Sequence, residues 1–328
     1  MLARNEWDPL TKVIVGTATG ARIPVMDKSL RCVNYADKKD VDHIPEGLYP
    51  QQVIDEANED LDAFVNLLQG EGVEVLRPEN NNPGYYNYCP RDTVFVHKDL
   101  ILATPQPLRA RHNEYLSMDY AFKSYKQQGY RYVAHMARKD EELYNENCVG
   151  DKSILALTEV EPCFDAANII RANDDVYYLV SNSGNKAGAL YLQSLLGTDT
   201  RVHLVEDVYS YMHIDSTISF LREGLMLLNP SRIKRVDQLP KSLRNWDIIW
   251  ADDPVDIGYY PGYCNASTWV NVNLFSISPS LCVLVEGQDA LRKQIESKGI
   301  DVAVLPMRHA RTLGGCFHCV TLDLERRH

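Results

Sequence analysis

The sequence has no excess of basic charge and no long apolar run. Lys and Arg together number 34 against 45 Asp and Glu, which gives a formal net charge of −11. Nucleic-acid surfaces and polybasic membrane anchors need clustered cations, so this balance argues against both. No apolar run approaches the roughly 18 residues that a membrane-spanning helix needs. We therefore expect neither a nucleic-acid partner nor a membrane partner.

The N-terminal residues also lack the apolar core of a secretory signal. The eight cysteines are scattered along the chain, apart from Cys316 and Cys319 with two residues between them. A zinc site needs a second ligand pair at comparable spacing, and the sequence offers none, so we expect no metal. These observations favour a cytoplasmic protein with reduced thiols.

A recurring order of two short strands, a helix and a further strand runs through the 328 residues, which suffice for one large domain or two. The clearest copy has strands at 272–277 and 281–285, a helix over 288–298 and a strand at 301–306. Other strands are predicted at 93–97, 100–104, 130–134, 176–181 and 201–205, and helices at 53–68, 109–127 and 186–196. The pattern predicts an α/β protein of ββαβ modules. It leaves open whether they form a sheet, a barrel or a ring.

Four polar clusters interrupt the apolar strands, at 89–92, 164–168, 212–215 and 314–319. A cysteine nucleophile needs a base to form its thiolate and a third group to orient that base. Cys319, His213 and Asp165 supply these residue types. Each also has a structural interpretation, because buried thiols, core histidines and turn carboxylates are common. The residue types alone leave open a cysteine-dependent enzyme or an α/β domain without catalysis.

Ordered motifs along nearly the whole chain narrow these alternatives. They are Asn-Glu-Trp-Asp-Pro-Leu at 5–10, Val-Ile-Val-Gly-Thr-Ala at 13–18, Tyr-Cys-Pro-Arg-Asp at 88–92, Phe-Asp-Ala-Ala-Asn-Ile at 164–169, His-Ile-Asp-Ser-Thr at 213–217, Asn-Pro-Ser-Arg at 229–232 and Gly-Gly-Cys-Phe-His-Cys at 314–319. Through them the chain resembles the amidinotransferases, the inosamine-phosphate enzymes more closely and the glycine amidinotransferases more distantly. The resemblance implies a five-bladed pseudo-symmetric α/β propeller of ββαβ modules, with residues 1–328 as a single catalytic domain.

The resemblance also implies the roles of seven residues. The catalytic group consists of Cys319, His213 and Asp165. The substrate-binding group consists of Asp92 and Asp215, which hold the guanidinium, and Arg232 and Ser267, which meet the carboxylate of the donor.

The implied reaction moves the amidino group of L-arginine to an acceptor amine and releases L-ornithine. The Cys319 thiolate attacks the guanidinium carbon, and His213 protonates the departing ornithine to leave an amidino-cysteine. An acceptor amine such as an aminocyclitol, glycine or lysine then takes the amidino group. This ping-pong scheme needs neither a metal nor an organic cofactor, and the family suggests a homodimer.

Two other functions remain open at this point. In the first, water replaces the amine, and the enzyme is an arginine deiminase-like hydrolase that makes citrulline. In the second, the chain is a binding protein on the same fold without catalysis. The retained catalytic residue types and the two transferase-like motifs at 89–92 and 314–319 favour transfer.

The chain departs from the family pattern in four places. Cys316 stands where relatives commonly have a third glycine; we interpret it as an inert side chain in preference to a thiol that pairs with Cys319, and the six other cysteines as packing residues. Ala266 and Ser267 replace a serine pair, the 80–88 region is short and rich in tyrosine, and the chain stops at His328. A changed loop near a pocket alters specificity, so the acceptor cannot be assigned from the sequence.

Overall fold

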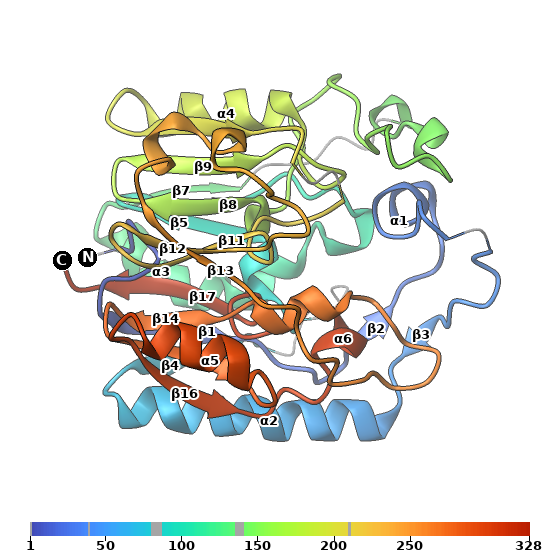
Figure 1. Cartoon of the computed structure of the whole chain (residues 1–328). Helices are drawn as coiled ribbons and strands as arrows, with labels where there is room; N and C mark the ends of the chain where they lie inside the picture. Colours follow the sequence, from blue (N-terminus) through green and yellow to red (C-terminus); the bar gives the residue numbers. More distant parts are fainter. Residues whose placement is uncertain (1, 39, 80–86, 135–140, 209–210) are drawn as a thin grey trace.

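The computed structural model describes residues 2–38, 40–79, 87–134, 141–208 and 211–328 (Figure 1). Most of the 80–88 loop singled out in the sequence lies outside these residues. Within them the strands form five three-stranded sheets and one two-stranded sheet. The α/β class predicted from the sequence is confirmed.

The five larger sheets share one arrangement of strands. In each, the first two strands are antiparallel, and the second and third are parallel. The sheets are β17 (Thr321–Arg326), β1 (Leu10–Val15) and β4 (Glu74–Leu76); β5 (Val94–His97), β6 (Leu100–Ala103) and β7 (Arg131–Ala134); β8 (Ile169–Ala172), β9 (Asp175–Leu179) and β10 (Arg201–Val205); β11 (Ile218–Arg222), β12 (Leu225–Leu228) and β13 (Asp247–Trp250); β14 (Phe275–Ser278), β15 (Leu281–Val285) and β16 (Asp301–Leu305).

A parallel pair needs a crossover connection, and helices supply it in four of these sheets. The crossover helices are α2 (Gln51–Gly70), α3 (Asp119–Gln127), α4 (Lys186–Leu196) and α5 (Asp289–Glu296). In the sheet β11-β12-β13 the crossover contains short 3-10 turns at Val236–Gln238 and Lys241–Leu243 instead. The predicted ββαβ order is therefore confirmed in four sheets and modified in the fifth. The remaining elements are β2 (Arg22–Ile23), β3 (Gly47–Leu48), α1 (Lys28–Val33) and α6 (Ala310–Leu313).

The helix predicted over 109–127 is wrong in its first half. Residues Arg109–Arg111 and Glu114–Met118 form 3-10 turns, and the α-helix begins at Asp119. The cause is tertiary: the Arg111 side chain turns inward and pairs with Asp92 at 2.7 Å and Glu114 at 2.8 Å. Similarly, the strand predicted from 272 begins at Phe275, because Thr268–Val272 form a 3-10 turn.

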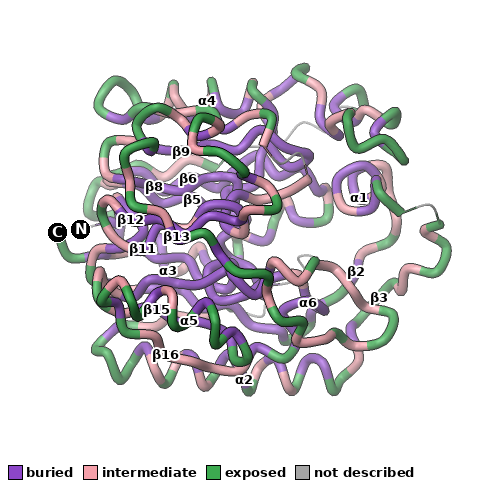
Figure 2. The backbone as a smooth tube through the Cα atoms, viewed as in Figure 1, coloured by how far each residue is buried: buried purple, intermediate pink, exposed green. Residues whose placement is uncertain are grey.

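The strands are largely buried (Figure 2), and apolar clusters join each three-stranded sheet to the next one along the chain. Ile14 of β1 shares a cluster with Val94 of β5, and the same kind of cluster links the second sheet to the third, the third to the fourth and the fourth to the last. A further cluster joins Phe275 of β14 to Val13 of β1, so the last sheet also packs against the first. The α2 helix covers this cluster with Val53, Ile54, Ala57, Leu61, Phe64 and Leu68, the predicted apolar stripe.

A network of buried charges lies between the sheets. Arg171 of β8 contacts Glu6 at 2.8 Å and Asp323 of β17 at 2.7 Å. Asp323 also accepts from Arg91 at 2.8 Å and from Arg326 at 2.7 Å. Because buried charges are stable only when they are paired, this network fixes how the N-terminal segment, β8 and β17 meet.

Candidate active site

The candidate catalytic residues lie in segments that enter the first strand of a sheet. Cys319 lies two residues before β17 and Asp92 two residues before β5. His213 and Asp215 lie shortly before β11, and Asp165 shortly before β8. The family resemblance implied that these residues act together, and the structure brings them together from four sheets through the contacts Cys319–Asp215, His213–Asp165 and His213–Asp92.

Cys319 is 4% exposed, and its thiol donates a hydrogen bond to Oδ2 of Asp215 over 3.3 Å. A hydrogen bond with Cys89, burial and the Asp215 carboxylate together raise the pKa of the Cys319 thiol well above its ordinary value. Gly315 lies between the two cysteines, where a Cβ would be 2.5 Å from Cys89 Sγ and 2.9 Å from Cys319 Cβ, so the site requires glycine. Without substrate, Cys319 is therefore a protonated thiol at neutral pH.

Two other cysteines, Cys316 and Cys89, lie in the motifs that form the site. Cys316 is fully buried, and burial raises its pKa to about 12, which agrees with an inert side chain. Cys89 is buried in an apolar cluster, as expected for a packing residue, and its thiol also lies against Cys319.

His213 pairs with Asp165, whose Oδ2 lies 2.9 Å from Nε2 of the imidazole. Its backbone has a φ of 53°, a left-handed conformation that costs about 1–3 kcal/mol in a non-glycine residue, and its N–H donates to Oδ1 of Asn168 over 3.1 Å. Burial alone would lower the pKa of His213, but the carboxylates of Asp92 and Asp165 outweigh it and raise the pKa to about 9. The imidazole is therefore charged at neutral pH and able to give a proton.

The Asp215 oxygen that accepts from the Cys319 thiol is also contacted by His318, the residue before Cys319. Nδ1 of His318 lies 3.0 Å from Asp215 Oδ2, and Nε2 lies 3.4 Å from Glu6 of the buried charge network. Burial would raise the pKa of Asp215, but the hydrogen bond from His318, the neighbouring imidazoles and the Asn273 amide hold it well below its ordinary value. Asp215 is thus an anion beside the thiol at neutral pH.

Asp92 is 3% exposed and pairs with Arg111 through Oδ2 at 2.7 Å. Burial raises its pKa, against the effects of His213 and Arg111. Its Oδ1, which lies 3.9 Å from Nδ1 of His213, has no hydrogen-bond partner among the described residues. A buried carboxylate oxygen without a donor is costly, so an N–H group of a bound cation would satisfy it.

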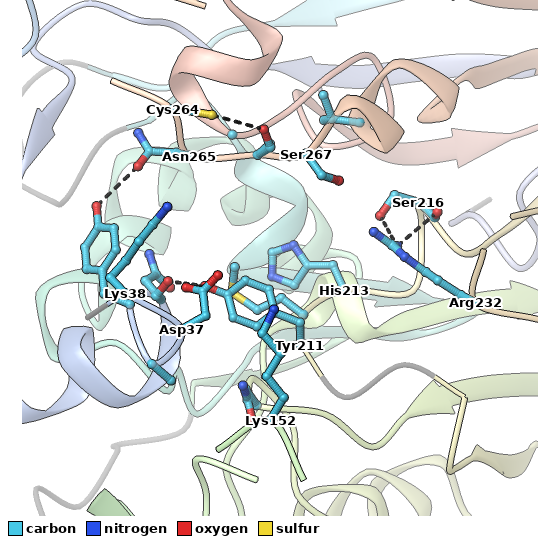
Figure 3. A pocket seen from close by; sticks show the side chains of 18 of the residues that line it. Asp37, Lys38, Lys152, Tyr211, His213, Ser216, Arg232, Cys264, Asn265 and Ser267 are labelled. Atoms are coloured by element: carbon cyan, nitrogen blue, oxygen red, sulfur yellow. Dashed lines mark hydrogen bonds between the residues drawn. The ribbon is translucent and has the colours of Figure 1, made fainter. Parts of the chain in front are cut away.

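A cavity of about 580 Å³ opens above Cys319, His213 and Asp215. Arg232 and Ser267 also line it, as the sequence predicted. In the view of Figure 3, Arg232 lies on one side of His213 and Lys38 on the other. Nη1 of Arg232 donates hydrogen bonds to the hydroxyl groups of Ser216 and Thr217, each over 2.8 Å. These bonds fix the Arg232 side chain at the cavity wall.

Sequence reasoning missed four residues of this site, namely Cys89, Arg111, Asn273 and His318. Cys89 and His318 stand inside motifs that were already singled out, so their neighbours were the available signal. Arg111 and Asn273 had no such signal, because only the tertiary structure brings them to the site.

Among the described residues, no group of three or more His, Cys, Asp or Glu side chains could hold a metal ion. Over the same parts of the chain, no helix is both long enough and apolar enough to cross a membrane.

Comparison with known proteins places this site in a family. The chain is 40% identical over 336 residues to an inosamine-phosphate amidinotransferase of Streptomyces glaucescens, covering 98% of this chain and 95% of that protein. The chain belongs to the amidinotransferase family. It is also 32% identical to an L-arginine:L-lysine amidinotransferase of Pseudomonas savastanoi pv. phaseolicola, over 98% of this chain and 93% of that protein. No family model matches the chain.

Solved structures agree with this assignment. An inosamine-phosphate amidinotransferase from Streptomyces griseus superimposes with a TM-score of 0.95 at 38% identity, covering 100% of this chain and 97% of that one. A dimethylarginine hydrolase from Pseudomonas aeruginosa superimposes with a TM-score of 0.61 at 15% identity, which shows a shared fold alone. The resemblance to amidinotransferases expected from the motifs is confirmed, whereas the hydrolase is related only distantly.

Proposed function

We propose that this amidinotransferase takes the amidino group from L-arginine through a covalent amidino-Cys319 and passes it to an acceptor amine. The observation that carries the proposal is that Cys319, His213 and Asp215 line one cavity, while Asp165 and Asp92 lie directly behind His213. A guanidinium is a planar cation, and these carboxylates would bind its N–H groups by charge-assisted hydrogen bonds.

Binding of the guanidinium would also activate the nucleophile. The Asp215 and Asp92 carboxylates help to raise the pKa of the Cys319 thiol, and a bound cation neutralises their effect. The thiol then loses its proton to solvent, and the thiolate attacks the guanidinium carbon. The C–N bond to ornithine breaks, and His213 gives its proton to the departing nitrogen. The acceptor amine later returns a proton to His213, bonds to the carbon and displaces the Cys319 thiolate.

The remaining substrate-binding residues fit the amino-acid end of the donor. Arg232 presents a cation on the cavity wall, where a carboxylate would form charge-assisted hydrogen bonds, and the Ser267 hydroxyl lines the same cavity. In this pose arginine would extend from Cys319 to Arg232.

Isotope exchange tests the first half of the reaction without knowledge of the acceptor. The enzyme should exchange label between ornithine and arginine, and a Cys319→Ala variant should lose this exchange by more than about 10⁴-fold. Cys282→Ala, at a buried cysteine of β15, is the matched control and should keep it. Exchange by Cys319→Ala would disprove the nucleophile, and citrulline formation without acceptor would favour hydrolysis.

For the acceptor, we propose a phosphorylated aminocyclitol, as the names of the relatives at 40% identity indicate. Lys38, Lys152 and Asp37 line the cavity (Figure 3), and Asp151 also belongs to its lining. Lysine side chains bind phosphate as point charges, and the two carboxylates would receive cationic or hydroxyl groups of the ring.

Comparison of acceptors tests this assignment. A phosphorylated aminocyclitol should accept the amidino group at least tenfold better, by kcat/KM, than its unphosphorylated form, glycine or lysine. Lys38→Ala and Lys152→Ala should raise KM for that acceptor and leave arginine–ornithine exchange intact, whereas Lys241→Ala, outside the cavity, should change neither. Equal use of phosphorylated and unphosphorylated acceptors would exclude the lysine pair as a phosphate site.

Three broader proposals accompany the reaction. The apolar clusters that join each sheet to the next and the last to the first support a single-domain, five-bladed α/β propeller. The eight free thiols support a cytoplasmic location. A homodimer is proposed from the family alone, and light scattering of the purified protein tests it.

A further inference from the structure

The fifth sheet also places a polar residue where the other four place site residues. Asn273 lies two residues before β14, as Cys319 lies two residues before β17 and Asp92 two before β5. It is 1% exposed and lines the cavity with Cys319 and Asp215.

The Asn273 side chain holds the backbone of the nucleophile. Its Oδ1 accepts the backbone N–H of His318 over 3.0 Å and that of Cys319 over 3.2 Å. One buried oxygen thus fixes two successive peptide groups, and with them the direction of the Cys319 side chain and of the His318 ring that contacts Asp215.

The other end of the same amide faces Asp215. Nδ2 of Asn273 is buried and lies outside ordinary hydrogen-bond geometry to the described residues, yet the amide still lowers the pKa of Asp215 as a hydrogen-bond donor. Asp215 is also the carboxylate that accepts the hydrogen bond of the Cys319 thiol. The Nδ2 donor therefore lies beside the groups that carry the negative charge once the thiol proton has left.

We infer that Asn273 is a positioning residue for the nucleophile: Oδ1 fixes the Cys319 backbone, and Nδ2 supplies a donor for the negative charge that Asp215 and the Cys319 sulfur share once the thiol proton has left. The inference rests on the proposed role of Cys319. The carboxylates of the site disfavour the Cys319 thiolate, because they carry a like charge. The amide N–H of Asn273 is a donor that stabilises the thiolate.

Substitutions of Asn273 test the roles of Oδ1 and Nδ2 separately. Asn273→Asp keeps an oxygen for the two backbone N–H groups, replaces the donor by an acceptor and adds a like charge beside Asp215. Asn273→Ala removes both ends. Asn271→Asp is the matched control: Asn271 is equally buried and lies in the 3-10 turn that Asn273 follows, but its amide donates to the carbonyl of Val255 at 2.6 Å.

The measurement is the rate at which iodoacetamide alkylates Cys319 at each pH, read by peptide mass spectrometry, together with kcat and KM for arginine. Asn273→Asp should move the pH profile of alkylation upward by about one pH unit or more and lower kcat at least tenfold without raising KM. Asn271→Asp should stay within about twofold of the parent in each quantity, as expected for a substitution that leaves the thiol environment intact.

Two results would be decisive. A parent-like alkylation profile in folded Asn273→Asp, verified by thermal unfolding, would overturn the inference. If Asn273→Ala does not fold, Asn273→Asp still decides it. Retained exchange by Cys319→Ala would instead refute the proposed nucleophile, so the two failures are distinguishable.

Discussion

The Asp165→Asn substitution tests the charge state proposed for His213. The Asp165 carboxylate and Asp92 together raise the pKa of His213 from 6.5 to about 9 against the effect of burial. That difference corresponds to about 3 kcal/mol in favour of the imidazolium. Replacing Asp165 by a neutral amide leaves Asp92 as the main stabilising charge, so we expect the His213 pKa to fall by about 1–2 pH units.

The assay is the pH profile of kcat for arginine–ornithine exchange. Exchange needs the imidazolium to protonate ornithine, so the alkaline limb should move downward by about 1–2 pH units in Asp165→Asn. Loss of the orienting acceptor should also lower the maximal kcat by about 10²–10⁴-fold. Asp175→Asn is the matched control, because Asp175 pairs with His203 at 2.6 Å outside the cavity. An unmoved alkaline limb in folded Asp165→Asn would refute the proposed charge state.

The same shift has a consequence for stability. A histidine whose pKa is raised in the folded state stabilises the fold fully below its unfolded pKa of about 6.5, and the contribution disappears as the pH rises through about 9. The free energy of unfolding should therefore decline between these values by at most about 3 kcal/mol. In Asp165→Asn the decline should be smaller, as measured by urea unfolding at each pH.

Three further predictions concern the surroundings of the nucleophile. Asp215→Asn should speed alkylation of Cys319 at neutral pH by about tenfold, because the carboxylate no longer raises the thiol pKa, while arginine turnover is lost; slower alkylation would contradict this. Gly315→Ala should abolish exchange and lower the melting temperature, since its Cβ would clash, whereas Gly70→Ala, with open space around it, should do neither. Asp323→Asn should cost about 3–5 kcal/mol in urea unfolding, because it leaves buried arginines without their partner; the lowered pKa of Asp323 also means that its contribution is present above about pH 4 and disappears as the pH falls.

Local patterns were enough to predict most of the strands and helices. The short continuous apolar run of β15 predicts a strand, and the spacing of Val53, Ala57 and Leu61 predicts α2, because both patterns depend on near neighbours in the chain. The prediction of a helix over the first half of 109–127 was wrong for the opposite reason. Arg111 is drawn inward by Asp92, nineteen residues away in sequence, and no local pattern reports such a contact.

The site was predictable where its residues stand in motifs and not elsewhere. Cys319, His213 and Asp165 could be proposed as a catalytic group because each stands in a motif that resembles the amidinotransferases, and together they supply a nucleophile, a base and an orienting carboxylate. Asn273 was not, because Asn271 and Asn273 alternate with apolar residues as the polar face of an ordinary strand does. Only the fold shows that one of these amides faces Cys319 and the other faces the Val255 carbonyl.

The pairing of β17 with β1 joins the two ends of the chain directly beside the nucleophile. β17 pairs antiparallel with β1 from Val15–Thr321 to Leu10–Arg326, and Cys319 precedes this pairing by two residues. During synthesis, every carboxylate of the site leaves the ribosome before the strand that seats the thiol. A nascent chain can therefore contain the aspartates proposed to bind the guanidinium without a positioned cysteine, and on the proposed mechanism activity begins only when β17 pairs with β1.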